Sequence, residues 1–259
     1  PPPPVPPPPP TRGVELAQDL LTTISVATLL LAIAVLVVQA LARGRVSLSL
    51  VAAAVIIGSV ISTEVLKDLI LARPEFVSSP LDGNSFPSGH TTVSFSVGVA
   101  ATLVVPESLR NRVALLAVIY GGAIGVSTLA AGWHRPSDAL GAYLITIAWA
   151  AAVVAVAGRL ERRDFIRSEA WPRIRSAAGF VGAASVVLVI GFLLALLVAL
   201  AGAVGITDWT KPNAAFLAAC AGLVASAAVL MAALIAALHA SLGPAAIRTT
   251  APREDGAPR

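Results

Sequence analysis

The residues best suited to chemistry lie in two short polar segments, each of which precedes a long apolar run. The first segment is Asn84-Ser85-Phe86-Pro87-Ser88-Gly89-His90-Thr91-Thr92, and the second is His134-Arg135-Pro136-Ser137-Asp138. In the first, Ser88 is a preferred helix N-cap, and Gly89 lets an outside group approach the backbone closely. The amide groups of such a helix start attract a phosphate group. His90 stands beside them and can pass a proton near neutral pH.

In the second segment, a histidine and an aspartate lie four positions apart. If a helix begins near Pro136, the Asp138 carboxylate can reach the His134 imidazole, fix its tautomer and raise the basicity of its other nitrogen. Upstream, Lys67 and Arg73 could clamp the oxygens of one phosphate group, Arg73 as a planar fork and Lys67 as a point charge. Taken alone, each polar segment is also compatible with an ordinary helix cap at a membrane interface.

These residues, taken in order, resemble the three signature motifs of the type 2 phosphatidic acid phosphatase (PAP2) superfamily, which includes membrane lipid phosphatases. The residues that carry the resemblance are Lys67, Arg73-Pro74, Ser88-Gly89-His90, Ser127 and His134 to Asp138. The resemblance covers roughly residues 64–142.

The resemblance implies a division of roles among the site residues. His134 would be the nucleophile that forms a phosphohistidine, and Asp138 would orient it. His90 would protonate the departing lipid alkoxide and then help water to attack. Lys67, Arg73, Ser88 and Gly89 would bind the phosphate. No metal or other cofactor is implied, because the cationic side chains stabilise the transferring group.

Two positions depart from the family pattern. Five residues separate Lys67 from Arg73, one fewer than is usual, and a looser turn at the end of the helix could absorb the difference. Thr128 stands where the family usually has a phosphate-binding arginine after the serine. Arg135 is the nearby candidate to replace that missing cation.

The composition indicates an all-α, polytopic membrane helix bundle. Hydrophobic residues make up 57% of the 259-residue chain and charged residues 12%, about half of the ~25% that is typical of soluble domains. The basic residues lie between apolar runs instead of forming one patch, so the net charge of +4 does not indicate nucleic-acid binding. The expected partners are the lipid bilayer and a membrane lipid phosphate. The sequence does not predict an oligomeric state.

Apolar runs of about 20 residues predict about seven transmembrane helices. They cover residues 20–42, 46–63 with a helical extension through 68, 88–105, 113–133, 139–158, 176–207 and 213–238. The expected organisation is a disordered Pro-rich tail (1–15), a PAP2-like core with the active site (16–158), a basic cytoplasmic linker (159–175), two additional transmembrane helices (176–240) and a cytoplasmic tail (241–259).

The distribution of basic residues predicts the orientation in the membrane. Seven crossings place 13 of the 18 basic residues on one face, which the positive-inside rule makes cytoplasmic. The motif segments then share the opposite face. We therefore expect a multi-pass plasma-membrane protein with an extracytoplasmic site.

Three alternative functions are compatible with this set of residues. The first is a phosphatase that hydrolyses a phosphomonoester or pyrophosphate of an isoprenoid or glycerolipid, with a polyprenyl phosphate as the leading substrate. The second is a non-hydrolytic relative that binds or transports a lipid phosphate, which Thr128 favours. The third is a lipid phosphotransferase that uses the same histidine.

Overall fold

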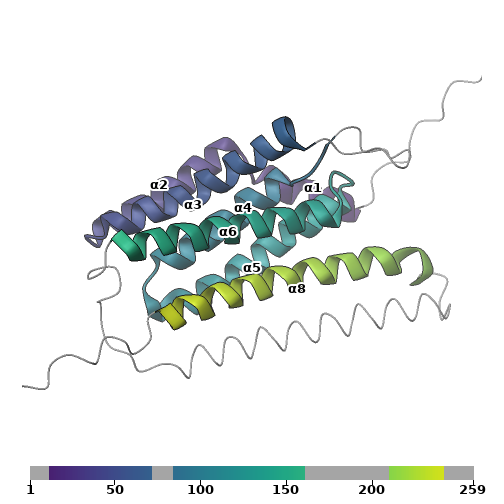
Figure 1. The fold of residues 1–259 in the computed structure, drawn as a ribbon. Helices are drawn as coiled ribbons and strands as arrows, with labels where there is room; N and C mark the ends of the chain where they lie inside the picture. The colour runs from purple at the N-terminus through teal and green to yellow at the C-terminus, as the bar shows by residue number, and fades with distance from the viewer. Residues whose placement is uncertain (1–11, 72–83, 161–209, 242–259) are drawn as a thin grey trace, which may run out of the picture.

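A computed structural model shows a bundle of antiparallel and crossing helices (Figure 1) and describes residues 12–71, 84–160 and 210–241. Within those ranges the chain is all-helical. The helices are α1 (Arg12–Thr22), α2 (Val26–Ala42), α3 (Val46–Val65), the π-helix η1 (Leu66–Ile70), α4 (Gly89–Val104), α5 (Glu107–Ala130), α6 (Pro136–Leu160) and α8 (Thr210–Ser241). The predicted helix over 176–207, the basic linker and Arg73 lie outside the described residues.

The short helix α4 is the centre of the bundle and packs against α2, α3, α5 and α6. One buried cluster joins α4 to α3, α5, α6 and α8, and includes the rings of Phe95 and Tyr143 with centroids 4.7 Å apart. A second cluster joins the other side of α4 to α2 and α3, around Ile56 and Ala100. Because protein surrounds α4, its first turn is held from several directions, and that turn carries Gly89 and His90.

Small residues allow α4 and α5 to cross closely. A Cβ atom added at Gly98 would lie 2.5 Å from the Cβ of Ala117, closer than two such atoms can approach. Association of apolar helices in lipid depends on this kind of close packing. A larger side chain at position 98 would therefore displace α5 from α4.

Four helical segments among the described residues are long and apolar enough to cross a membrane. They are Val46–Ile70, Ser108–Ala130, Pro136–Val156 and Phe216–Ile235. The bent pair α1 and α2 would make a fifth span if counted as one. Apolar side chains such as Leu31 and Val38 of α2 are 64% and 63% exposed, as expected for a surface that faces lipid. The predicted number of seven spans is not established by these residues.

The first predicted span, residues 20–42, is wrong as a single helix. The chain bends by 52° between α1 and α2. Thr22 and Thr23 donate their hydroxyl groups to the carbonyls of Asp19 and Leu20 at the end of α1. Ser25 then caps α2 through a reciprocal capping box with Thr28. Residues 12–15, which were predicted to belong to the disordered tail, lie in α1.

The antiparallel path of α3, α4, α5 and α6 brings the described motif residues, Lys67, Ser88 to His90 and His134 to Asp138, to one end of the bundle (Figure 1). At the opposite end, the Arg43 guanidinium donates to the carbonyl of Val104, 2.9 Å away, and so joins the α2–α3 turn to the end of α4. The basic turns, which carry Arg43, Arg45, Arg110 and Arg112, therefore lie at the opposite end of these helices from the motif segments.

Candidate active site

The turn between α5 and α6 fixes the backbone of His134. Gly132 has a φ of +71°, in the left-handed region that glycine tolerates best. The amides of Trp133 and His134 both donate to the carbonyl of Thr128, at 3.0 and 3.2 Å. These bonds close the end of α5 and leave the imidazole of His134 at the entrance to the next helix.

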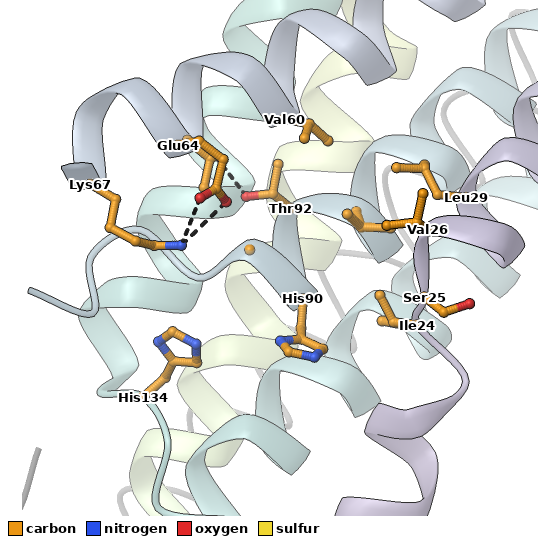
Figure 2. Close-up of a pocket in the computed structure, with 13 residues that line it drawn as sticks. Ile24, Ser25, Val26, Leu29, Val60, Glu64, Lys67, His90, Thr92 and His134 are labelled. Atoms are coloured by element: carbon orange, nitrogen blue, oxygen red, sulfur yellow. Dashed lines mark hydrogen bonds and ion pairs between the residues drawn. The ribbon is translucent and has the colours of Figure 1, made fainter. Parts of the chain in front are cut away.

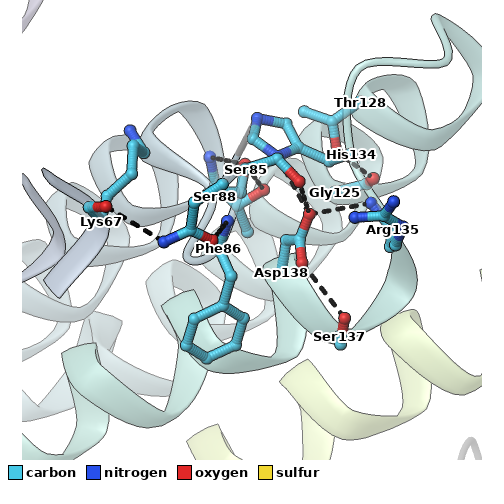
Figure 3. A network of polar contacts seen from close by, with 12 residues as sticks. Lys67, Ser85, Phe86, Ser88, Gly125, Thr128, His134, Arg135, Ser137 and Asp138 are labelled. Atoms are coloured by element: carbon cyan, nitrogen blue, oxygen red, sulfur yellow. Dashed lines mark hydrogen bonds and ion pairs between the residues drawn. The ribbon is translucent and has the colours of Figure 1, made fainter. Parts of the chain in front are cut away.

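Asp138 lies in the first turn of α6 and links that helix start to the imidazole (Figure 3). Its Oδ2 atom lies 3.4 Å from Nδ1 of His134, and it accepts hydrogen bonds from the amide of Arg135 at 3.0 Å and the hydroxyl of Ser85 at 2.7 Å. Ser137 donates to Oδ1 at 3.1 Å. Because a carboxylate can only accept, Nδ1 carries the proton and Nε2 presents its lone pair.

Burial distinguishes this carboxylate from an ordinary surface helix cap. The side chain of Asp138 is 0% exposed and that of His134 is 12% exposed. A buried carboxylate needs several donors to offset its lost hydration, and Asp138 has them. The pairing predicted from the spacing of His134 and Asp138 is present.

Ser88 joins the starts of α4 and α6. Its amide donates to the carbonyl of Asp138 at 3.0 Å, and its Oγ atom accepts from the amide and hydroxyl of Thr91 at 3.4 and 3.0 Å. The predicted N-cap is therefore present. Ser88 is completely buried and does not line the cavity described below. This position argues against the direct phosphate contact expected for Ser88, which acts instead as the cap that positions α4.

The first turn of α4 offers two amides to a ligand. The initial amides of a helix have no partner within the helix, and those of Ser88 and Thr91 are already used. The amides of Gly89 and His90 follow the cap directly and belong to residues that line the cavity. A Cβ atom at Gly89 would lie 3.3 Å from Oε1 of Glu64 and 3.7 Å from Nζ of Lys67, so glycine leaves room for both side chains.

Lys67 reaches the site from a widened helical turn. Its Nζ atom lies 3.2 and 3.4 Å from the two carboxylate oxygens of Glu64, three positions earlier in the chain. The chain around Lys67 forms η1, in which the amide of Leu71 donates to the carbonyl of Leu66 at 2.9 Å. Asn84 stabilises this turn by donating to the carbonyls of Lys67 and Leu71 at 3.0 and 2.7 Å.

A cavity of about 600 Å³ lies between these elements, and Figure 2 shows its lining. Four of the predicted site residues contribute to its wall, namely Lys67, Gly89, His90 and His134. Asp138 and Ser88 support that wall from behind. The remaining lining residues are Ile24, Ser25, Val26, Leu29, Val60, Thr63, Glu64, Thr92 and Val93.

His90 is half-buried between aromatic and charged neighbours. Its ring packs against Trp133, with centroids 5.6 Å apart and planes tilted by 51°. Burial, followed by the electrostatic effects of His134 and of the Lys67 charge, lowers the pKa of His90 below its ordinary value. A histidine with a lowered pKa gives up its proton readily, as a general acid must.

The positions of Thr128 and Arg135 differ from what a phosphate-binding role, suggested by the family pattern, would require. Thr128 is completely buried and donates its hydroxyl to the carbonyl of Gly125 at 2.7 Å. Its carbonyl holds the backbone of His134. The amide of Arg135 donates to Asp138, but Arg135 does not line the cavity. The structure therefore gives no support to Arg135 as a replacement phosphate ligand.

Several contributors were not predicted as site residues. Ser85 donates to the orienting carboxylate, Trp133 packs on His90, and Thr92 lines the cavity beside it. Ser85 and Thr92 lie inside the polar segment that begins at Asn84, and Trp133 directly precedes His134, so proximity to the motifs was the available signal.

No group of three or more His, Cys, Asp and Glu side chains within the described ranges is arranged to hold a metal ion. Among protein families, residues 48–162 match the PAP2 superfamily. The matching region contains nearly all of α3 and the whole of α4, α5 and α6, and thus every described segment that lines the cavity except the turn between α1 and α2 and the start of α2. Comparisons with curated proteins and with solved structures each gave no match.

Proposed function

Residues 48–162 form a PAP2 superfamily domain in an apolar helix bundle, and from this premise we propose that the chain is an integral-membrane lipid phosphatase. It hydrolyses a phosphomonoester or pyrophosphate of an isoprenoid or glycerolipid through a phosphohistidine. The observation that supports this proposal most directly is the shared cavity. His134, backed by the buried Asp138, lines it together with His90 and Lys67.

In the first step, Nε2 of His134 attacks phosphorus while the bond from phosphorus to the leaving oxygen breaks. His90 gives its proton to that oxygen, so the lipid leaves as an alcohol or, from a pyrophosphate, as a phosphate. Lys67 and the amides of Gly89 and His90 stabilise the charge on the transferring oxygens. Arg73 is a further proposed ligand.

In the second step, water attacks the phosphohistidine. His90, now neutral, accepts a proton from that water, and the phosphorus–nitrogen bond breaks to release inorganic phosphate and regenerate His134. Atoms and charge balance without another reactant. No metal enters either step, since the cationic side chain and the backbone donors supply the stabilisation.

The proposed setting is the plasma membrane, with the cavity on the extracytoplasmic side. The separation of basic turns from motif segments supports this orientation. In a Cys220→Ser background, a cysteine placed at Ser79 should react with a membrane-impermeant thiol reagent in intact cells, whereas one at Ser168 should not. The reverse labelling pattern would contradict the orientation.

Phosphate release by the purified protein in lipid nanodiscs tests the activity. We expect turnover of at least one lipid phosphate, including polyprenyl phosphates in the panel, that persists in EDTA and is blocked by vanadate. His134→Ala should abolish it. Activity lost in EDTA and restored by magnesium would contradict the histidine mechanism, and transfer to an added alcohol in place of water would identify a phosphotransferase.

A further inference from the structure

The cavity continues beyond the catalytic residues to the elbow, defined as residues 23–25 between α1 and α2. Its apolar half consists of five side chains, which are Ile24, Val26, Leu29, Val60 and Val93. Three of these come from the elbow and α2, outside the PAP2 match over residues 48–162. The polar half carries Lys67 and His134.

The order of the side chains across the cavity gives it a direction. In Figure 2, Lys67 and His134 lie on one side, His90 lies in the middle, and Ile24, Val26 and Leu29 lie on the other side. Phosphoryl transfer places the attacking and leaving atoms roughly in line through phosphorus. A phosphate attacked by His134 and protonated through His90 therefore directs its leaving group toward the elbow.

Hydrogen bonds hold the elbow in a defined conformation at the cavity wall. The capping box of Ser25 and Thr28 fixes the start of α2, and the Thr23 hydroxyl lies 3.3 Å from that of Tyr120 on α5. The hydroxyl of Ser25, the polar side chain at this wall, accepts from the amide of Thr28. Among the described lining residues, the elbow side carries no charged side chain, which suits hydrocarbon better than a sugar or nucleoside.

We propose that this apolar half is the subsite for the part of the hydrocarbon chain nearest the phosphate. Through the elbow, the enzyme then selects its substrate by the hydrocarbon chain and not by the head group. The inference rests on the proposed phosphatase function and assigns its specificity-determining residues. Val26 is 75% exposed at the rim, so the distal part of a long chain continues past it into the bilayer. The subsite therefore recognises the first carbons of the chain.

A series of methyl, butyl, hexyl and octyl phosphates tests this subsite in the full-length protein. Each methylene group that enters the apolar half should raise kcat/KM by about fourfold, until the subsite is filled. The double variant Val26→Thr/Val60→Thr keeps the side-chain shapes but adds hydroxyl groups. It should lower the ratio of octyl to methyl phosphate kcat/KM by about tenfold, because hydroxyl groups would face the chain.

Val38→Thr is the matched control, since Val38 lies on α2, is 63% exposed and does not line the cavity. Detergent or lipid partitioning of the substrates is the same for both variants, so their comparison isolates the cavity. An unchanged octyl-to-methyl ratio in the double variant, or an equal fall in the control, would overturn the inference. So would an absence of chain-length dependence in the unmutated protein.

Binding measurements separate this inference from the proposed function. If the unmutated protein releases no phosphate from any substrate, the hydrolytic function fails. Non-hydrolysable alkyl phosphonates of the same chain lengths then report on the subsite by calorimetry. Affinity that rises with chain length and falls in the double variant supports the apolar subsite without catalysis, whereas equal affinity for all chain lengths overturns it.

Discussion

Within the polar half of the cavity, α5–α6 and α3 hold their charged side chains in different ways. On the α5–α6 side, Asp138 is fully buried and receives hydrogen bonds from Ser85, Arg135 and Ser137 beside its contact with His134. On the α3 side, Lys67 is 22% exposed and its carboxylate partner Glu64 is 50% exposed. The proposed nucleophile, His134, is thus held in place before substrate binds, while the proposed phosphate ligand, Lys67, can exchange Glu64 for a phosphate oxygen.

The difference has an energetic basis. Each buried donor left without an acceptor costs about 1–3 kcal/mol, so the Asp138 network resists rearrangement. An exposed ion pair contributes only about 0–1 kcal/mol, so a dianionic phosphate can replace Glu64 at little cost. The π-helical turn around Lys67 adds local irregularity, a feature frequent at functional sites. The predictions below test this contrast between a fixed and an exchangeable side.

Asp138→Asn should have the largest effect. The amide can offer only one accepting oxygen and can present an NH₂ group to donors, so the orientation of His134 is lost. We expect kcat to fall by about 10²–10⁴-fold, the scale seen when an orienting carboxylate becomes an amide. Steady-state phosphate release measures it, with the exposed Asp68→Asn as the control. A loss below tenfold would show that Asp138 is only a structural cap.

Lys67→Met should lower kcat/KM by about 10²-fold, because one cationic contact to the transferring group is removed. The thermal stability of the Lys67→Met protein should hardly change, since the ion pair between Lys67 and Glu64 is exposed. Parallel melting curves and kinetics on Lys67→Met and Asp138→Asn measure the contrast. If Lys67→Met destabilised the fold as much as Asp138→Asn, the two sides of the site would not differ as described.

The pH dependence of kcat/KM should show the titration of His90. A general acid must be protonated, so activity should decline as pH rises through the lowered pKa of His90, and this limb should lie below about pH 6.5. The Lys67 charge is one cause of the lowered pKa, after burial and His134. Removing it in Lys67→Met should raise that pKa and move the limb to higher pH. A limb that stays in place would exclude this coupling.

Glu64→Gln should have the smallest effect, and in the opposite direction. It removes a negative charge that competes with phosphate for Lys67, so KM and the inhibition constant for vanadate should fall by up to about fivefold. Inhibition curves at constant pH measure the change. Weaker vanadate binding in Glu64→Gln would mean that Glu64 positions Lys67 for the ligand instead of competing with it.

Local signals predicted much of the site. Ser88 as a helix cap, the helix start near Pro136 and the contact of His134 with Asp138 follow from residue type and from a spacing of four positions. Such features depend on a single helical turn, which the sequence specifies directly.

Features set by packing between distant segments were not predicted. The hydrogen bond from Ser85 to Asp138 joins residues 53 positions apart, and no periodicity reports it. The break at residues 23–25 was hidden because the surrounding run is apolar throughout, although Thr22, Thr23 and Ser25 carried the capping signal. Ser88 was expected to bind phosphate from the family resemblance, but its burial behind the cavity could be seen only in the assembled bundle.

Trapping the covalent intermediate tests the central claim most directly. The protein is mixed with a lipid phosphate labelled with radioactive phosphorus, quenched within one turnover at alkaline pH to preserve phosphohistidine, and digested for mass spectrometry. The account predicts acid-labile phosphate on His134 that is absent from His134→Gln. Phosphate release without any labelled protein, or label on a residue other than His134, would contradict it.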